Sequence, residues 1–215
     1  MFDARSLLLY LCADPSLCAG RPIDEAVEAA LRGGATAVQL RCKGIPAKDF
    51  YEAALILRAL ARRFGAAMVV NDRADIAAAV GADGLHIGQA DIPLEAARRV
   101  VGAGVFIGVS ARTPEAAVAA RDGGADYLGC GPVFPTSSKE GLADAVIGVE
   151  GLREIRRAVD IPVVGIGGIG PSNAAEAIGA GASGVAVISS VLSRPDIEAA
   201  AAELRRRVEQ AIRGL

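Results

Sequence analysis

The stretch Gly33-Gly34-Ala35-Thr36-Ala37-Val38-Gln39-Leu40 ends an alanine-rich helical pattern with two glycines and passes at once into a short apolar run. Similar phrases return at residues 81–87, 123–130 and 181–188. Glycine tolerates the left-handed backbone that often ends a helix, and a short apolar run bounded in this way is typical of a buried strand. The repeat therefore predicts four helix-to-strand units.

Another apolar run lies before each of these units, at residues 7–11, 68–70, 105–109 and 162–166, and the last helix is expected at about 196–212. Eight strands that alternate with helices predict an α/β protein with eight parallel strands, a single (β/α)8 TIM barrel. The runs are short and continuously apolar, as strands covered on both faces should be. A doubly wound open sheet is the competing architecture, but it would not obviously use eight equivalent strands. We expect one catalytic domain over residues 1–215.

Composition narrows the classes of partner. The chain has 215 residues, 52% of them hydrophobic, and a net charge of −2, which argues against broad binding of nucleic acid. It has no apolar run of eighteen or more residues, so no membrane partner is expected. Four cysteines without a CxxC pair, beside one histidine, favour reduced thiols in the cytoplasm over a zinc site or a disulfide framework. A homo-oligomer is left open.

The end of the second predicted strand carries a polar face. Gln39, Arg41 and Lys43 lie on one face because side chains alternate along a strand, whereas the apolar residues between them lie on the other. Ligands bind at the carboxyl ends of parallel strands. Two cations in line in a chain of slightly negative charge predict a small, highly anionic ligand.

Two carboxylates follow the next two strands. Asp72 and Asp91 stand at adjacent strand ends, where they could hold one Mg²⁺ together with water and phosphate oxygens. Both also precede helical patterns, and aspartate is a favoured helix N-cap. The residues alone leave these two interpretations equally open.

A phosphate site is expected near the last two strands. Gly167-Gly168 follows the strand at 162–166, and Ile188-Ser189 stands at the end of the strand at 184–188. Barrels often bind phosphate here, since glycine lets backbone N–H groups approach a ligand. The connection between Cys130 and Gly148, which carries Lys139, is unusually long, and we expect it to close over a ligand rather than to be a disordered insertion. A site with two anionic poles would suit two phosphorylated small molecules.

Six phrases together resemble the thiamine phosphate synthase family: VQLRCK (38–43), VVNDRADIAAAVGADGLHIGQADIP (69–93), IGVSART (107–113), YLGCGPVFPTSSKEG (127–141), PVVGIGGI (162–169) and GVAVIS (184–189). The resemblance implies a (β/α)8 fold. It also implies an enzyme, a transferase that joins a hydroxymethylpyrimidine diphosphate to a thiazole phosphate, or its carboxylated form, and releases pyrophosphate. The implied mechanism is a Mg²⁺-assisted dissociative substitution with no general base.

The resemblance also implies the site. The pyrimidine diphosphate would contact Gln39, Leu40, Arg41, Cys42, Lys43, Asn71, Ser110 and Lys139, and of these Arg41, Lys43, Ser110 and Lys139 would act in catalysis. The thiazole phosphate would contact Thr136, Ser137, Ser138, Gly168, Ile188 and Ser189. Asp72 and Asp91 would hold one Mg²⁺ per subunit. The chain departs from the family pattern at Ala13, where threonine is usual, and at Ser138, which replaces a second threonine.

Three rival functions remain. A related thiazole tautomerase is similar to this family, but its acid–base histidine would stand where this chain has Arg112. A binder that had lost catalysis would keep Gly168 and Ser189 but lose Asp72, Asp91 or Lys139. An unrelated barrel isomerase or aldolase would need an acid–base pair or a Schiff-base lysine, and neither is evident. The single histidine, His86, is expected to point into the barrel in a hydrogen-bonded structural role.

Overall fold

The computed structural model describes residues 2–136 and 146–215, and within them eight parallel strands form a closed barrel in sequence order. The strands are β1 (Leu9–Ala13), β2 (Ala37–Leu40), β3 (Ala67–Asn71), β4 (Gly84–Ile87), β5 (Phe106–Ala111), β6 (Tyr127–Cys130), β7 (Val163–Ile166) and β8 (Gly184–Val187). The barrel closes where Leu11 of β1 pairs with Val187 of β8. The expected (β/α)8 fold is confirmed.

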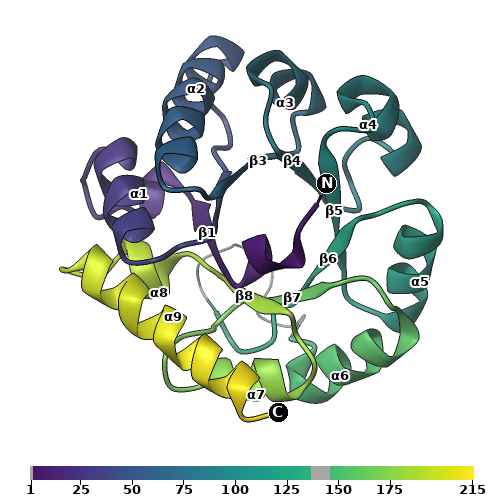
Figure 1. Cartoon of the computed structure of the whole chain (residues 1–215). Helices are drawn as coiled ribbons and strands as arrows, with labels where there is room; N and C mark the ends of the chain where they lie inside the picture. Colours follow the sequence, from purple (N-terminus) through teal and green to yellow (C-terminus); the bar gives the residue numbers. More distant parts are fainter. Residues whose placement is uncertain (1, 137–145) are drawn as a thin grey trace.

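Helices surround the barrel and cover the outer face of the sheet (Figure 1). They are α1 (Ile23–Arg32), α2 (Ala47–Arg63), α3 (Ala74–Val80), α4 (Leu94–Val101), α5 (Pro114–Asp122), α6 (Gly148–Ala158), α7 (Ala174–Gly179), α8 (Ser189–Leu192) and α9 (Ile197–Arg213). Two 3-10 turns, η1 (Ala4–Leu7) and η2 (Pro15–Leu17), flank β1. None of the helices in the described part of the chain is long and apolar enough to cross a membrane.

The glycine repeat has the predicted backbone geometry. Gly34, Gly81, Gly124 and Gly181 all have positive φ, at 96°, 63°, 91° and 99°. Each ends a helical segment a few residues before β2, β4, β6 or β8 begins. These four strands begin at the residues expected from the sequence, because the left-handed glycine fixes where the helix stops.

Alternation along the strands produces two apolar layers. Leu40, Leu85 and Leu128 point outward and pack beneath the helices in the larger core. Tyr10, Val69 and Tyr127 point inward and belong to a smaller cluster inside the barrel. The barrel interior is therefore filled with side chains at its centre.

The first strand begins later than expected. β1 spans Leu9–Ala13 rather than 7–11, because residues Ala4–Leu7 form a 3-10 turn whose first N–H groups are capped by Asp3. The side chain of Leu7 is fully buried within the inner cluster. Figure 1 shows this amino-terminal turn lying across the middle of the ring of strands. It plugs the amino-terminal end of the barrel.

Candidate functional site

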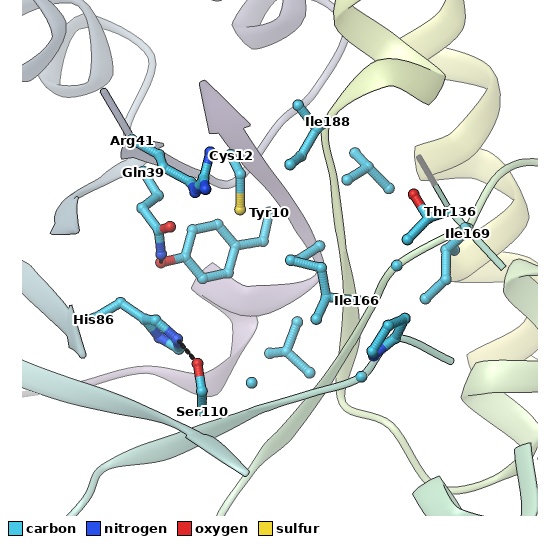
Figure 2. A pocket seen from close by; sticks show the side chains of 18 of the residues that line it. Tyr10, Cys12, Gln39, Arg41, His86, Ser110, Thr136, Ile166, Ile169 and Ile188 are labelled. Carbon is cyan, nitrogen blue, oxygen red and sulfur yellow. Dashed lines mark hydrogen bonds between the residues drawn. The ribbon is translucent and has the colours of Figure 1, made fainter. Parts of the chain in front are cut away.

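A cavity of about 1030 Å³ opens at the carboxyl ends of the strands and receives residues from all eight of them. Of the predicted site residues, those that line it are Gln39, Arg41, Lys43, Asn71, Asp72, Asp91, Ser110, Thr136, Gly168, Ile188 and Ser189. Figure 2 shows several of these side chains converging from different strands. Residues far apart in the sequence thus share one concave surface, as expected for a barrel site.

The second strand presents the predicted polar face. Gln39, Arg41 and Lys43 line the cavity although β2 itself ends at Leu40. Leu40 is fully buried in the outer core and Cys42 packs against that core, so their side chains do not line the cavity. Side chains alternate, and only the backbone of these two residues could face a ligand there.

Arg41 is held by a residue that the sequence did not single out. Its Nη1 lies 2.6 Å from Oδ2 of Asp14, and both side chains are largely buried. The other oxygen of Asp14 accepts hydrogen bonds from the backbone N–H and the hydroxyl of Ser16. β1 and β2 are paired neighbours, which brings these two strand ends together.

The structure excludes one of the two interpretations of the aspartates. Arg73 and Pro93 occupy the N-cap positions of α3 and α4, so neither Asp72 nor Asp91 caps its helix. Asp72 has a φ of 63°, a backbone conformation that most residues avoid, and its carboxylate faces Lys43 with Oδ2 3.8 Å from Nζ. The capping interpretation is wrong for both residues.

The oxygen donors at this edge fit a hard divalent cation. Oδ2 of Asp91 accepts a hydrogen bond of 2.7 Å from the backbone N–H of Gly88, which fixes the carboxylate. Its Oδ1 has no hydrogen-bond partner among the described residues. Asn71, Asp72 and Asp91 line the cavity at or after the ends of the paired strands β3 and β4, and Mg²⁺ is usually held by one or two carboxylates. No cluster of three or more acidic, histidine or cysteine ligands occurs in the described ranges.

A chain of side-chain hydrogen bonds crosses the floor of the cavity. Gln39 Nε2 donates to the Tyr10 hydroxyl at 2.8 Å, and the Tyr10 and Tyr127 hydroxyls lie 2.9 Å apart. His86 Nδ1 lies 2.9 Å from the Tyr127 hydroxyl, and His86 Nε2 lies 3.0 Å from Ser110 Oγ, the contact drawn in Figure 2. His86 points into the barrel as expected, while its neighbour Leu85 packs in the outer core.

Burial keeps both phenols of this chain protonated. Tyr10 and Tyr127 are almost completely inaccessible, and desolvation raises the pKa of each well above its ordinary value. The sequence suggested neither tyrosine, since each reads as an apolar position within a strand. Their inward direction follows from the register of the barrel.

The turn after β7 approaches the loop after β6 very closely. Gly168 has a φ of 65°, and a Cβ there would lie 2.5 Å from the carbonyl oxygen of Pro135. Asn173 fixes this turn, because its Nδ2 donates to Gly168 O and its Oδ1 accepts from Gly170 N. Ile188 and Ser189, at the start of α8, lie on the same side of the cavity. Ser137, Ser138 and Lys139, with most of the long loop expected to close over a ligand, lie outside the described residues.

Two further cations, Arg112 and Arg194, line the cavity. Arg112 follows β5 and Arg194 follows α8. Together with Arg41 and Lys43 they bring the described lining to four guanidinium or ammonium groups, against the two carboxylates of Asp72 and Asp91. A positive site in a chain of net charge −2 favours anionic ligands.

Known proteins resemble the chain over almost its whole length. The family model described as thiamine monophosphate synthase matches residues 9–191. A thiamine-phosphate synthase of Moorella thermoacetica is 54% identical over 203 residues, which are 94% of this chain and 96% of the relative. One of Chloroflexus aurantiacus is 49% identical and covers 93% of this chain and 92% of its own length. The solved thiamine phosphate pyrophosphorylase of Pyrococcus furiosus superimposes with a TM-score of 0.89 at 44% identity, covering 97% of this chain and 98% of that one.

Proposed function

The chain belongs to the thiamine monophosphate synthase family, and from this premise we propose that it is a transferase that makes thiamine phosphate. The substrates would be 4-amino-5-hydroxymethyl-2-methylpyrimidine diphosphate and a hydroxyethylthiazole phosphate, or its carboxylated form. Pyrophosphate would be the second product.

One observation carries this proposal: a single cavity has two regions suited to two phosphorylated groups. Arg41 and Lys43, after β2, and Asp72, after β3, form one wall, and Gly168, after β7, and Ser189, after β8, form another. The first wall offers cations and hard oxygen ligands, which suit a diphosphate. The second offers a tight glycine turn and a hydroxyl, which suit a monophosphate.

The diphosphate wall would bind and orient the leaving group. Arg41, held from behind by Asp14, presents its guanidinium to phosphate oxygens in a fixed position. Lys43 is 64% exposed, so its ammonium can move from Asp72 to a phosphate oxygen when a ligand enters. Asn71, Ser110 and Lys139 would complete this subsite.

Asp72 and Asp91 would hold Mg²⁺, which when bound supplies positive charge that offsets the charge gathering on the departing pyrophosphate. The chain's own cations, Arg41 and Lys43, act on the same charge.

The thiazole phosphate would lie against Gly168, Ile188 and Ser189, with Thr136, Ser137 and Ser138 on the facing loop. In this arrangement the methylene-to-oxygen bond of the pyrimidine diphosphate breaks and its electron pair leaves with pyrophosphate. The lone pair of the thiazole nitrogen then forms the new carbon–nitrogen bond. No proton moves in this step, so the protein contributes position, charge and exclusion of water.

The test is turnover by the purified chain with both substrates and Mg²⁺, following thiamine phosphate and pyrophosphate together. We expect Mg²⁺-dependent formation of both products, and a loss of at least about 100-fold in Asp91→Ala, since a metal ligand is removed. Asp75→Asn is the matched control, because Asp75 is exposed on α3 and its ion pair is with the neighbouring Arg73. No product from a folded chain with intact substrates would refute the proposal, and a thiazole tautomerase assay would follow.

A further inference from the structure

The hydrogen-bond chain on the cavity floor joins two residues that face the ligand. Gln39 stands at one end, Ser110 at the other, and Tyr10, Tyr127 and His86 lie between them. Every link measures between 2.8 and 3.0 Å, within the ordinary range for hydrogen bonds. The two tyrosines have no other hydrogen-bond partner in the described ranges. A hydrogen placed at one end therefore constrains every other link.

The direction of the chain can be followed from Gln39. Because its Nε2 donates to Tyr10, the Tyr10 oxygen is an acceptor and its own hydrogen must go to Tyr127. The Tyr127 oxygen then accepts, and its hydrogen goes to Nδ1 of His86. A neutral imidazole that accepts at Nδ1 carries its proton on Nε2, which donates to Ser110 Oγ.

The two ends of the chain are left with opposite character. Ser110 Oγ already accepts from His86, so its own hydrogen is available to a ligand. Oε1 of Gln39 has no hydrogen-bond partner among the described residues. Every side-chain oxygen or nitrogen that is fully buried in the described ranges does have a partner, so Oε1 is not fully buried. Oε1 therefore reaches the cavity as an acceptor.

We propose that Tyr10, Tyr127 and His86 are positioning residues that fix the hydrogen-bond polarity of the site: a donor at Ser110 and an acceptor at Gln39. The complementary ligand has a hydrogen-bond donor facing Gln39 and an acceptor facing Ser110, as an aminopyrimidine has. An oxopyrimidine would direct a carbonyl oxygen at Oε1 of Gln39 and leave two acceptors opposed. This ligand assignment rests on the proposed function, whereas the polarity of the hydrogen-bond chain does not.

The opposite polarity is also self-consistent, which makes the proposal testable. If the Gln39 amide were rotated, Tyr10 would donate to Oε1, Tyr127 to Tyr10 and His86 Nδ1 to Tyr127. The Ser110 hydroxyl would then donate to Nε2 of His86, and the ligand would meet a donor at Gln39 and an acceptor at Ser110. The two polarities therefore place the His86 proton on different nitrogens.

The experiment uses the full chain labelled with ¹⁵N-histidine and expressed without a histidine tag. His86 is the only histidine, so one side chain gives the whole spectrum. One-bond coupling of hydrogen to Nε2 alone, near neutral pH, is the expected result. A proton on Nδ1, on both nitrogens or exchanging between them would overturn the proposal.

The variant Tyr127→Phe interrupts the hydrogen-bond chain in its middle with little loss of packing. His86 Nδ1 loses its donor, so we expect a measurable Nδ1–H population, which a purely structural tyrosine would not produce. Phe106→Leu is the matched control, because the Phe106 ring contacts Tyr127 edge-on with centroids 6.0 Å apart but joins none of the hydrogen bonds. The control should keep the wild-type spectrum, and the same spectral change in both variants would contradict the proposal.

A second readout tests the ligand. Wild type should bind the aminopyrimidine diphosphate at least about 100-fold more tightly than its 4-oxo analogue. In Tyr127→Phe this ratio of affinities should fall about tenfold. The Tyr10 hydroxyl has then lost Tyr127 as its acceptor, so it can donate to Oε1 of Gln39 once the Gln39 amide rotates. An unchanged ratio would remove the positioning role. If neither pyrimidine binds while Nε2 alone carries the proton, the proposed function fails and the polarity stands.

Discussion

Asp14 and Arg41 form an ion pair of 2.6 Å in which both side chains are largely withdrawn from solvent, at 12% and 15% exposure. A guanidinium at a ligand site is useful only if it stays in place before the ligand arrives. Asp14, the residue after β1, supplies that restraint, and its second oxygen caps the turn η2. The ion pair therefore links Arg41, which belongs to a family motif, to Asp14, which the sequence alone places only at the end of the first strand.

The variant Asp14→Asn tests this restraint. Asparagine keeps an oxygen for the cap but removes the charge that holds Arg41. We expect the KM for the pyrimidine diphosphate to rise about tenfold with a small change in kcat, measured by steady-state kinetics. Glu198→Gln is the control, since it breaks an exposed pair with Arg32 and should change KM less than about twofold. An unchanged KM in a folded Asp14→Asn protein would show that Arg41 needs no partner.

The metal site predicts a specific change in the need for Mg²⁺. Asp72→Asn removes one negative charge from the cavity wall while keeping a similar shape. The Mg²⁺ concentration for half-maximal activity should rise about 10- to 100-fold, and a chelator should abolish wild-type activity reversibly. A Mg²⁺ titration of turnover measures both effects. Equal Mg²⁺ dependence in wild type and variant would exclude Asp72 as a ligand.

The amino-terminal plug predicts a large effect at one glycine. A Cβ on Gly184 would lie 1.9 Å from the carbonyl oxygen of Leu7, which is backbone and cannot rotate away. Gly184→Ala should therefore lower the free energy of unfolding by about 3 kcal/mol, measured by urea denaturation. Gly104→Ala is the control, because a Cβ there meets nothing within 4 Å. Similar stabilities of the two variants would show that the turn Ala4–Leu7 does not seal the barrel.

Cys130 predicts how stability responds to alkaline pH. Burial raises the pKa of its thiol from 9.0 to about 12, so the folded state keeps the proton that the unfolded chain gives up. This contribution is fully present below pH 9 and is lost as pH rises towards 12. At about pH 10.5 the loss from this group is about 2 kcal/mol. The buried phenols of Tyr10 and Tyr127 act in the same direction at higher pH.

Urea denaturation of wild type and Cys130→Ala at pH 8 and about pH 10.5 isolates the thiol, since the alanine variant should lose less stability between the two conditions. Each protein is compared by the change in its unfolding free energy between the two pH values, so a packing defect that is the same at both pH values does not affect the result. Equal losses in the two proteins would show that the folded state also ionises Cys130.

Much of the fold could be predicted from local patterns. Glycines at positive φ, such as Gly34 and Gly81, end helices and so set where β2 and β4 begin. The polar face at Gln39, Arg41 and Lys43 followed from alternation, and all three line the cavity. The first strand was misplaced by two residues because Leu7, the first residue of the apolar run, ends a 3-10 turn that Asp3 caps. The N-cap interpretation of Asp72 and Asp91 failed because Arg73 and Pro93 occupy those positions.

The sequence by itself determined the (β/α)8 barrel and the polar residues at its strand ends, because helix stops and side-chain alternation depend only on neighbours along the chain. Only the tertiary structure decided which residues act together. Tyr10 and Tyr127 are 117 positions apart and meet at 2.9 Å, and Asp14 reaches Arg41 across 27 positions. Such contacts depend on how eight strands are paired and tilted when the barrel closes, and no local pattern records that geometry.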